Sequence, residues 1–506
     1  HARSRAHYVN VNAKLRPKLR DTRHTRRNLL SVMAAPIEKS HGPGYKTPLD
    51  AMKNGPQETI VYCTAIYTGT GINKPDYLAT IDVDSKSDTY CEVIHRTELA
   101  VGDECHHFGW DACSSCFHNP KARRRHLIMP CMGSGNVYVL STEDLRAPKI
   151  VKQLDGQEIR ERFDLSFPHT SHCLADGTVM ISYMGNGASQ GRGDYLLLDS
   201  KKDFGYADNP IYSADKKGTR YGYDFWYQPR LNVMISTEWG NPSAFSKGFD
   251  PSLIESSYGS RLYVWDWEKH TVIQEIELGA AGLIPLEIRF HHKPDSPHGY
   301  VAAALSSAMI HFYLDDATKK WKADSVIQVE GVDLNGWALP TCPGLITDFL
   351  ISMDDKYLYF ANWLHGDVRQ YDISDPFKPV LKGQVFLGGV YQEGSAFSPS
   401  KDSVRRPKNP SPKGVKIQGG PQMIQLSLDG KRLYVTNSLY SPWDTQFYPE
   451  MLQKGSQMVR MICDIEKGGM KLDETFVVDF GKEPNGPALA HEMRYPGGDC
   501  TSDIWI

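Results

Sequence analysis

Short apolar stretches recur along the chain in pairs, and each pair predicts two β-strands. Apolar or aromatic residues alternate with polar ones in most stretches, and Gly, Asp, Pro or Asn bound them, which is typical of strands joined by tight turns. The second stretch closes on an aspartate-bearing turn, as in DYLATIDVD and VRQYDIS. The first stretch of each pair begins at Val61, His126, Thr178, Asn232, Tyr300, Tyr357 or Arg432. The chain therefore contains seven similar units.

The spacing of the units predicts a β-propeller. Successive units start 52 to 75 residues apart, which leaves room for insertions. A further strand often precedes the pair, as in LEIRFHH, and another follows it, as in HTVIQEIEL. This gives about four strands per unit, the number that a propeller blade needs. Independent two-strand modules are disfavoured, because one unit alone could not bury its apolar face. We predict an all-β fold, a seven-bladed propeller with inter-blade insertions over residues 42–506.

The N-terminal segment and the rest of the chain carry net charges of opposite sign. The first thirty residues carry nine Lys or Arg against Asp21, which is +8, so the remaining chain carries −11 of the total −3. We expect residues 1–41 to form a basic, disordered extension. A mitochondrial transit peptide is one interpretation of the Arg-rich segment, and an N-terminus extended upstream of a start at Met33 is the favoured one.

A second segment of unusual composition lies at residues 401–416. It is rich in Pro, Lys and Ser and predicts a mobile surface loop before the last blade. No interleaved aromatic residues accompany its charge, so nucleic-acid binding is not expected. No apolar run reaches the roughly 18 residues that span a bilayer. Ten cysteines in 506 residues favour reduced thiols in the cytosol over a disulfide scaffold.

Histidines mark the predicted inner strands of several blades. His107, His172 and His491 stand shortly before or within such strands, and His365 lies in the hairpin of the sixth unit. Inner strands of a propeller begin near the central channel, so these imidazoles can converge on one metal ion. Imidazole suits copper, iron, zinc or nickel, and the residues alone leave the choice open. With eighteen histidines in the chain, any single one is more often a packing or surface residue.

Carboxylates occupy the matching places in other inner strands. We expect Asp224, Glu287 and Asp348 to orient the ligand imidazoles by hydrogen bonds.

The sequence Cys113-Ser-Ser-Cys116 allows several kinds of chemistry. Two sulfurs at this spacing can form a disulfide or share a soft metal. A structural zinc set of Cys105, His106, Cys113 and Cys116 is an alternative, although it lacks the two-pair spacing of a zinc finger. Two reduced thiols packed under a blade are at least as consistent with the pattern.

Long strings of the chain resemble the selenium-binding protein family, whose animal members are methanethiol oxidases. The resemblance covers about residues 42–506 and includes HHFGWDACSSCF, HTSHCLADG, GYDFWYQPR, LYFANWLHGDVRQYDISDP and FGKEPNGPALAHEMRYPGGDC. It implies a cytosolic oxidoreductase, with the nucleus as a second location. Its reaction would convert methanethiol, oxygen and water to formaldehyde, hydrogen sulfide and hydrogen peroxide.

The resemblance also implies a cofactor and a set of site residues. The metal would be copper, with His107, His172, His365 and His491 as ligands and His106 and His169 in reserve. Selenium would bind through Cys91, and Cys113 and Cys116 would take part in catalysis. The expected partners are a small thiol and O2, with peripheral membrane association also allowed. The alternative is a non-enzymatic propeller adaptor that senses selenium or redox state or serves in transport.

Overall fold

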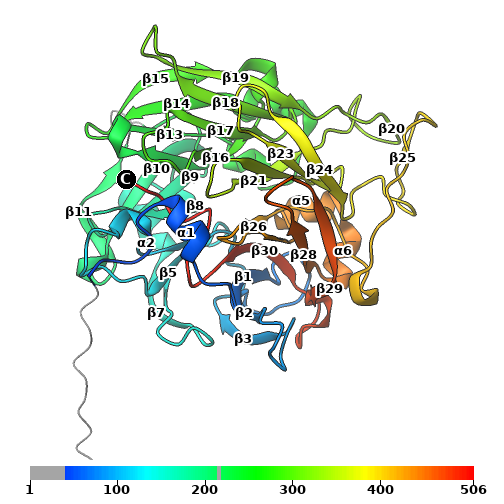
Figure 1. Cartoon of the computed structure of the whole chain (residues 1–506), viewed down its shortest axis with the longest axis horizontal. Coiled ribbons are helices and arrows are strands. Elements are labelled where there is room, and N and C mark those ends of the chain that lie inside the picture. The colour runs from blue at the N-terminus through cyan, green and yellow to red at the C-terminus, as the bar shows by residue number, and fades with distance from the viewer. Residues whose placement is uncertain (1–39, 214–217) are drawn as a thin grey trace, which may run out of the picture. The chain divides into compact units, whose positions relative to one another are not determined.

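Seven four-stranded antiparallel sheets surround a common axis in the computed structural model (Figure 1), which describes residues 40–213 and 218–506. This arrangement confirms the predicted seven-bladed β-propeller. The disorder predicted for residues 1–41 falls almost entirely outside the described residues.

The blades follow one another along the chain, each with its innermost strand first, except that the last strand of the chain belongs to the first blade. The first blade comprises β30 (Leu489–Arg494), β1 (Ile60–Ile66), β2 (Tyr77–Asp82) and β3 (Val93–Glu98), and the second β4 (Gly109–Trp110), β5 (His126–Pro130), β6 (Val137–Ser141) and β7 (Lys149–Leu154). The third comprises β8 (Ser166–Cys173), β9 (Thr178–Gly185), β10 (Gly191–Asp199) and β11 (Gly205–Tyr212), and the fourth β12 (Phe225–Gln228), β13 (Val233–Ser236), β14 (Arg261–Asp266) and β15 (Thr271–Glu277). The fifth comprises β16 (Pro285–Phe290), β17 (His298–Ala303), β18 (Ala308–Leu314) and β19 (Trp321–Gln328), and the sixth β21 (Ile346–Ile351), β22 (Tyr357–Asn362), β23 (Asp367–Asp372) and β24 (Val380–Phe386). The seventh comprises β26 (Ile424–Leu426), β27 (Arg432–Val435), β28 (Gln457–Cys463) and β29 (Met470–Asp479).

All seven predicted strand pairs are present as the two middle strands of the blades. The middle strands are apolar because both of their faces are covered by neighbouring blades, and every residue of β1 and β22 is buried. The outer strands face solvent on one side, so β15 alternates between half-buried and exposed residues. This difference explains why the sequence pattern was clearest for the middle pair of each unit.

The ring is closed by the C-terminal strand. β30 pairs antiparallel with β1, with Cys63 opposite Met493 and Ala65 opposite Ala490. The register shifts between these two pairs. Sequence periodicity did not assign this strand to the first blade, because the pairing joins segments more than 400 residues apart. This pairing completes the first blade with its innermost strand and brings the residues of β30 beside the second blade.

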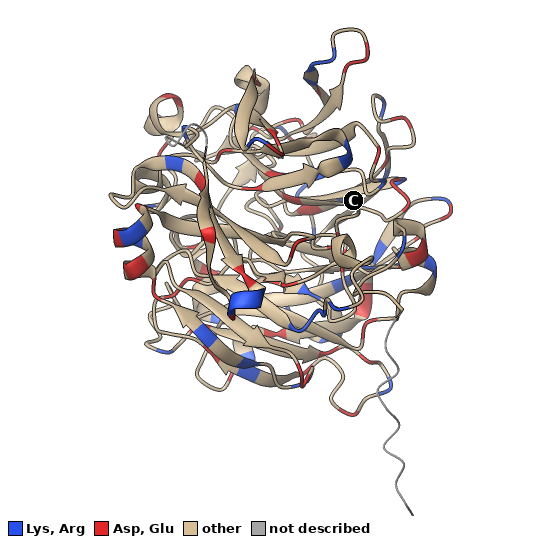
Figure 2. Ribbon diagram, turned by 90° about the vertical axis from the view of Figure 1, so that its left-hand side faces the viewer, with Lys and Arg blue, Asp and Glu red and all other residues tan. Residues whose placement is uncertain are grey.

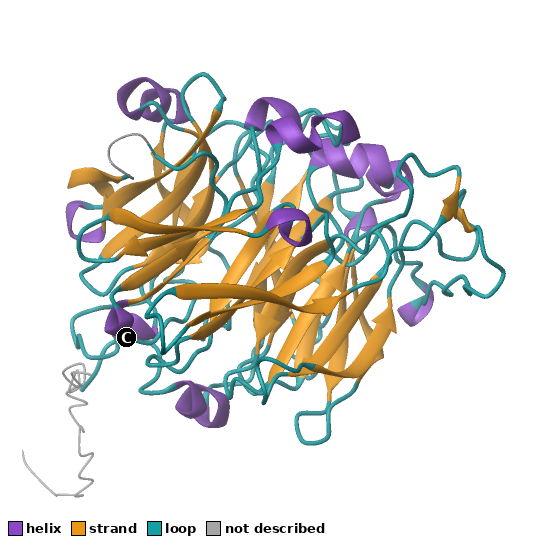
Figure 3. Ribbon diagram, turned by 90° about the horizontal axis from the view of Figure 1, so that it is seen from above, coloured by secondary structure: helices purple, strands orange, loops and turns teal. Residues whose placement is uncertain are grey.

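Short helices lie outside the sheets (Figure 3). They are α1 (Pro48–Asn54), α2 (Gly156–Phe163), α3 (Pro242–Phe245), α4 (Ile254–Ser257), α5 (Ser441–Phe447) and α6 (Pro449–Lys454). Proline opens α1, α3 and α6, where its missing N–H costs no hydrogen bond. The indole of Trp443 in α5 donates a hydrogen bond to the carbonyl of Phe245 in α3, which joins these two helices.

The segment at residues 401–416 is connected to the residues before it through Arg406. The guanidinium of Arg406 donates hydrogen bonds to the carbonyls of Gln392, Ser395 and Phe397. A two-stranded sheet of β20 (Leu334–Asn335) and β25 (Ser398–Pro399) precedes the segment. The mobility expected for residues 401–416 stays a prediction. Within residues 40–213 and 218–506, no helix has the length and apolar character needed to cross a membrane.

Candidate metal centre

Four buried imidazoles from three blades lie in contact. His106 and His107 lie just before β4, His169 is in β8 and His491 is in β30. The ring centroids of His106 and His491 are 4.2 Å apart, and those of His107 and His169 are 4.0 Å apart. None of the four residues is more than 4% exposed. Two predicted ligands, His107 and His491, are therefore brought together with the two reserve residues.

The Nε2 atoms of His107 and His491 face each other at 3.4 Å. The Nδ1 of His491 lies 2.7 Å from the carbonyl oxygen of Ser438. A carbonyl can only accept, so this Nδ1 carries the proton and the neutral ring keeps a lone pair on Nε2. The Nδ1 of His107 lies 3.1 Å from Oε1 of Glu492 and donates to this carboxylate. Both Nε2 atoms thus present lone pairs to the same small space.

Glu492 fixes the orientation of His107. Its Oε1 also accepts from the guanidinium of Arg494, and its Oε2 accepts from the backbone N–H of Phe108 at 2.6 Å. Burial raises the pKa of Glu492, whereas Arg494 and this N–H act in the opposite direction. The carboxylate thus interacts with three partners, the imidazole, the guanidinium and the backbone N–H. Such an arrangement is typical of a group that holds a metal-binding imidazole in one tautomer.

Burial keeps the cluster neutral. It lowers the pKa of His106 to about 3 and the pKa values of His107, His169 and His491 well below the ordinary value. Neighbouring imidazoles lower the pKa of His107 further, because two adjacent rings cannot both carry charge. Neutral imidazole is the form that binds metals.

Glu104 connects His106 to helix α5. Its Oε1 lies 2.9 Å from Nε2 of His106 and also accepts from the backbone N–H of Ser441 at 3.0 Å. The hydroxyl of Ser441 donates to the same carboxylate. Burial raises the pKa of Glu104 to about 7. The first residue of α5 is therefore anchored beside the cluster.

Aromatic side chains cover the cluster. The ring of Tyr223 lies 4.0 Å from that of His169, and Tyr440 approaches His106 at 5.5 Å. Trp239 stacks on Phe245 at 4.0 Å and contacts Tyr440. These residues belong to one buried apolar cluster. The imidazoles are thus enclosed by largely apolar side chains.

The other two predicted ligands have different neighbours. The imidazole of His172 packs against Phe225 and Trp226, and its buried Nε2 has no hydrogen-bond partner among the described residues. His365 donates from Nε2 to the carbonyl of Cys342 at 3.0 Å and contacts Tyr391. Neither ring contacts a cluster imidazole in the described part of the chain.

The expectation for the three carboxylates is wrong. Asp224 and Glu287 accept from the guanidinium of Arg289 at 2.8 and 2.7 Å, and Asp348 lies 3.9 Å from it. Arg289 is buried and attracts these acids more strongly than a neutral imidazole can. The groups that do orient the imidazoles, Glu492 and Glu104, stand one and two residues from a cluster histidine. A glutamate so close to a histidine was the feature of the sequence that could have identified these two groups.

The predicted reactive cysteines form a group of their own. Cys113, Cys116 and Cys173 surround the hydroxyl of Ser115, with sulfur–oxygen distances of 3.2, 3.8 and 4.0 Å. Burial acts to raise the pKa of Cys113, but hydrogen bonds from Cys173 and Ser115 outweigh it, and the pKa is lowered. All ten cysteines are described and free of disulfides. Cys91 is half-buried, and burial raises its pKa.

The zinc alternative receives no support from this arrangement. Cys105 pairs with Cys131 across a β-bridge, away from the Cys113 group. Across residues 40–213 and 218–506, no three His, Cys, Asp or Glu side chains converge on a single point at metal-binding distances.

Comparisons with known proteins agree with this architecture. The chain is 55% identical over 472 residues to a methanethiol oxidase of Xenopus laevis, covering 92% of this chain and 99% of the relative. It is 52% identical over 474 residues to selenium-binding protein 1 of Arabidopsis thaliana, covering 92% and 96%. The structure of a hypothetical selenium-binding protein from Sulfolobus tokodaii is 37% identical, with a TM-score of 0.80 over 91% of this chain and 98% of that one. The pattern of the family described as 56kDa selenium binding protein (SBP56) matches residues 39–506, and the chain belongs to this family.

Proposed function

We propose that the protein is a methanethiol oxidase with a copper ion bound at the histidine cluster. The reaction would take one methanethiol, one O2 and one water to formaldehyde, hydrogen sulfide and hydrogen peroxide, which balances in every element. Relatives at 52–55% identity carry the name methanethiol oxidase. The observation that carries the proposal is the pair of facing Nε2 lone pairs on His107 and His491.

The cluster residues fit a copper ion. Two lone pairs facing each other at 3.4 Å repel unless a proton or a metal ion lies between them. Metal–nitrogen bonds of about 2.0 Å at a tetrahedral angle place two donor atoms about 3.3 Å apart, close to the distance seen here. Imidazole is a preferred ligand of copper. A third ligand would require rotation of a neighbouring ring, and His169 is placed for this beside His107.

The bound copper would supply coordination of the substrate sulfur and one-electron exchange with oxygen. The protein's own groups would do the rest. Glu492 and Ser438 hold the donor nitrogens in place. The aromatic cover binds the methyl group of the thiol and excludes water.

His106 is placed to accept the proton of the thiol. Its Nε2–H donates to Glu104, so Nδ1 is left with a lone pair. As Nδ1 takes up the thiol proton, Nε2 would pass its own proton to Glu104, so the ring, whose pKa burial lowers to about 3, stays neutral. The pKa of Glu104, about 7, allows this carboxyl to hold or release the proton. We place the reaction in the cytosol, since ten free thiols favour a reducing compartment.

A second function through cysteine is favoured by one observation. Cys91 is more exposed than the other nine cysteines, so an incoming selenium compound can reach it. The non-enzymatic adaptor remains the alternative, in which the histidines have no role in function.

Turnover by the purified full chain tests the proposal. The protein is stripped of metal, reloaded with copper and given methanethiol in air, and hydrogen sulfide and peroxide are measured together. We expect equal amounts of both products, with loss of activity in His107→Ala and retention in a variant of the exposed His118, His118→Ala. Equal activity of stripped and copper-loaded protein would contradict the proposal, and complete inactivity of both would favour the adaptor.

A further inference from the structure

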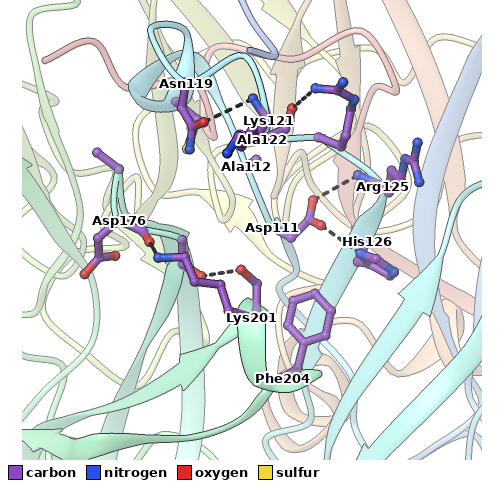
Figure 4. A pocket seen from close by; sticks show the side chains of 15 residues that line it. Asp111, Ala112, Asn119, Lys121, Ala122, Arg125, His126, Asp176, Lys201 and Phe204 are labelled. Carbon is purple, nitrogen blue, oxygen red and sulfur yellow. Dashed lines mark hydrogen bonds and ion pairs between the residues drawn. The ribbon is translucent and has the colours of Figure 1, made fainter. Parts of the chain in front are cut away.

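A cavity of about 440 Å³ lies between the second and third blades (Figure 4). It is lined by the segment 111–126 between β4 and β5, by the turn 175–177 between β8 and β9, and by residues 200–204. Its volume falls within the roughly 300–1,000 Å³ of small-molecule sites. Its lining residues are separate from the histidine cluster.

The cavity has an excess of positive charge. Its lining includes the cationic residues Lys121, Arg123, Arg125 and Lys201 and the acids Asp111 and Asp176. Asp111 is already engaged, since Oδ1 accepts from the backbone N–H of Arg125 at 3.0 Å and Oδ2 lies 2.8 Å from Nδ1 of His126. The lining therefore carries a net +2, although residues 40–506 together carry −11.

Three of the four cations lack an acidic partner among the described residues, and the fourth, Arg125, lies 3.8 Å from Glu143 at an exposed position. Arg123 donates to the carbonyls of Pro120 and Ala122 at 2.5 and 2.7 Å, and Lys201 donates to the carbonyl of Asp176 at 2.5 Å. Carbonyl oxygens satisfy the N–H groups but do not neutralise the charge. No carboxylate of the described residues lies within 4.0 Å of the charged groups of Lys121, Arg123 or Lys201. Along the ribbon in the view of Figure 2, cationic and acidic residues are interspersed.

Apolar side chains line part of the cavity. The ring of Phe204 lies along one wall, edge-on to His126 at 4.8 Å. Ala112, Ala122 and Cys116 complete this part of the lining. Cys116 is 3% exposed, and burial raises the pKa of its thiol to about 11. A ligand that fills the cavity would lie against this residue.

We propose that this cavity binds a small organic dianion with a flat apolar part, and that its cations make the approach to Cys116 selective for anions. Two negative charges would match the net +2 of the lining, and the apolar part would pack on Phe204. A dicarboxylate and a phosphate monoester share this chemistry. The proposal is independent of the reaction at the histidine cluster.

The rate of disulfide exchange at Cys116 tests the proposal. The probes are the dianionic aromatic disulfide 5,5′-dithiobis(2-nitrobenzoate) and the neutral 4,4′-dithiodipyridine. In each case the Cys116 sulfur bonds to one reagent sulfur, the reagent disulfide breaks, one aromatic thiolate leaves and the thiol proton passes to solvent. Mass spectrometry of the peptide that contains Cys116 separates its modification from that of Cys91.

We expect the ratio of the anionic to the neutral rate to fall roughly tenfold in the double variant Lys121→Gln/Lys201→Gln, because a cationic cleft raises the local concentration of anions by about 10-fold or more. The matched control Lys86→Gln/Lys378→Gln makes the same charge change at exposed sites and should leave the ratio unchanged. Isophthalate and phenyl phosphate should slow the labelling of Cys116 in the native chain, and the more effective of the two identifies the anion class. An unchanged ratio in the cavity variant, an equal fall in both variants, or no protection by either anion would overturn the proposal.

Discussion

The Nε2 atoms of His107 and His491 lie 3.4 Å apart although 384 residues separate them in the chain. One precedes the short inner strand of the second blade and the other lies in the strand that closes the first. Their approach therefore depends on the pairing of β30 with β1. Ring closure and the proposed metal centre are thus parts of the same structural feature.

Replacing Glu492 by Gln should weaken copper binding while leaving the fold intact. The variant keeps the shape of the side chain but removes the charge that holds the Nδ1 proton of His107. Loss of such a partner typically costs about 10–100-fold in metal affinity or activity. Copper titration measures the effect, and the exposed Glu474→Gln serves as the control. Equal copper affinity in both variants would rule out an orienting role for Glu492.

His365→Ala should retain its copper, in contrast to His107→Ala. His365 uses Nε2 to bind the Cys342 carbonyl and contacts none of the four cluster imidazoles among the described residues. Metal content measured on both variants decides between this outcome and the ligand role implied by family resemblance. The same measurement on His172→Ala tests the other predicted ligand, whose buried Nε2 has no partner in the described residues. Copper loss in either variant would return that residue to the ligand set.

Leu489→Ala should destabilise the closure of the ring. The side chain of Leu489 in β30 is fully buried, and removing a buried leucine costs about 2–5 kcal/mol in the free energy of unfolding. Leu145, which is 45% exposed, provides the control substitution Leu145→Ala. Chemical denaturation followed by tryptophan fluorescence compares them. Equal midpoints would show that β30 contributes little to stability.

Asp444→Asn should alter the dependence of stability on pH. Burial raises the pKa of Asp444 to about 8, and its carboxylate accepts from the hydroxyl of Ser438 and the N–H of Leu439. Since the folded state holds this proton more tightly than the unfolded chain, Asp444 contributes stability at low pH that is lost as pH rises from about 4 to about 8. The variant should therefore show a smaller fall in melting temperature over that range. An identical fall in the native chain would contradict the raised pKa.

Much of the fold could be predicted from the sequence because the middle strands of every blade are buried on both faces. The continuous apolar runs at Tyr357 and Val61 follow directly from that burial. The pairing of β30 with β1 could not be predicted, since no local pattern records a contact between the two ends of a chain. His107 and His491 were found because they flank inner strands. Asp224 was expected to orient an imidazole, and only the structure shows that it pairs with Arg289 instead.

Copper stoichiometry and the electron paramagnetic resonance spectrum of the Cu(II) protein test the central claim most directly. We predict one copper ion per chain, with nitrogen hyperfine structure that changes or disappears in His491→Ala and is unchanged in His118→Ala. The same stoichiometry and the same nitrogen couplings in His491→Ala would contradict a metal centre at the facing imidazoles.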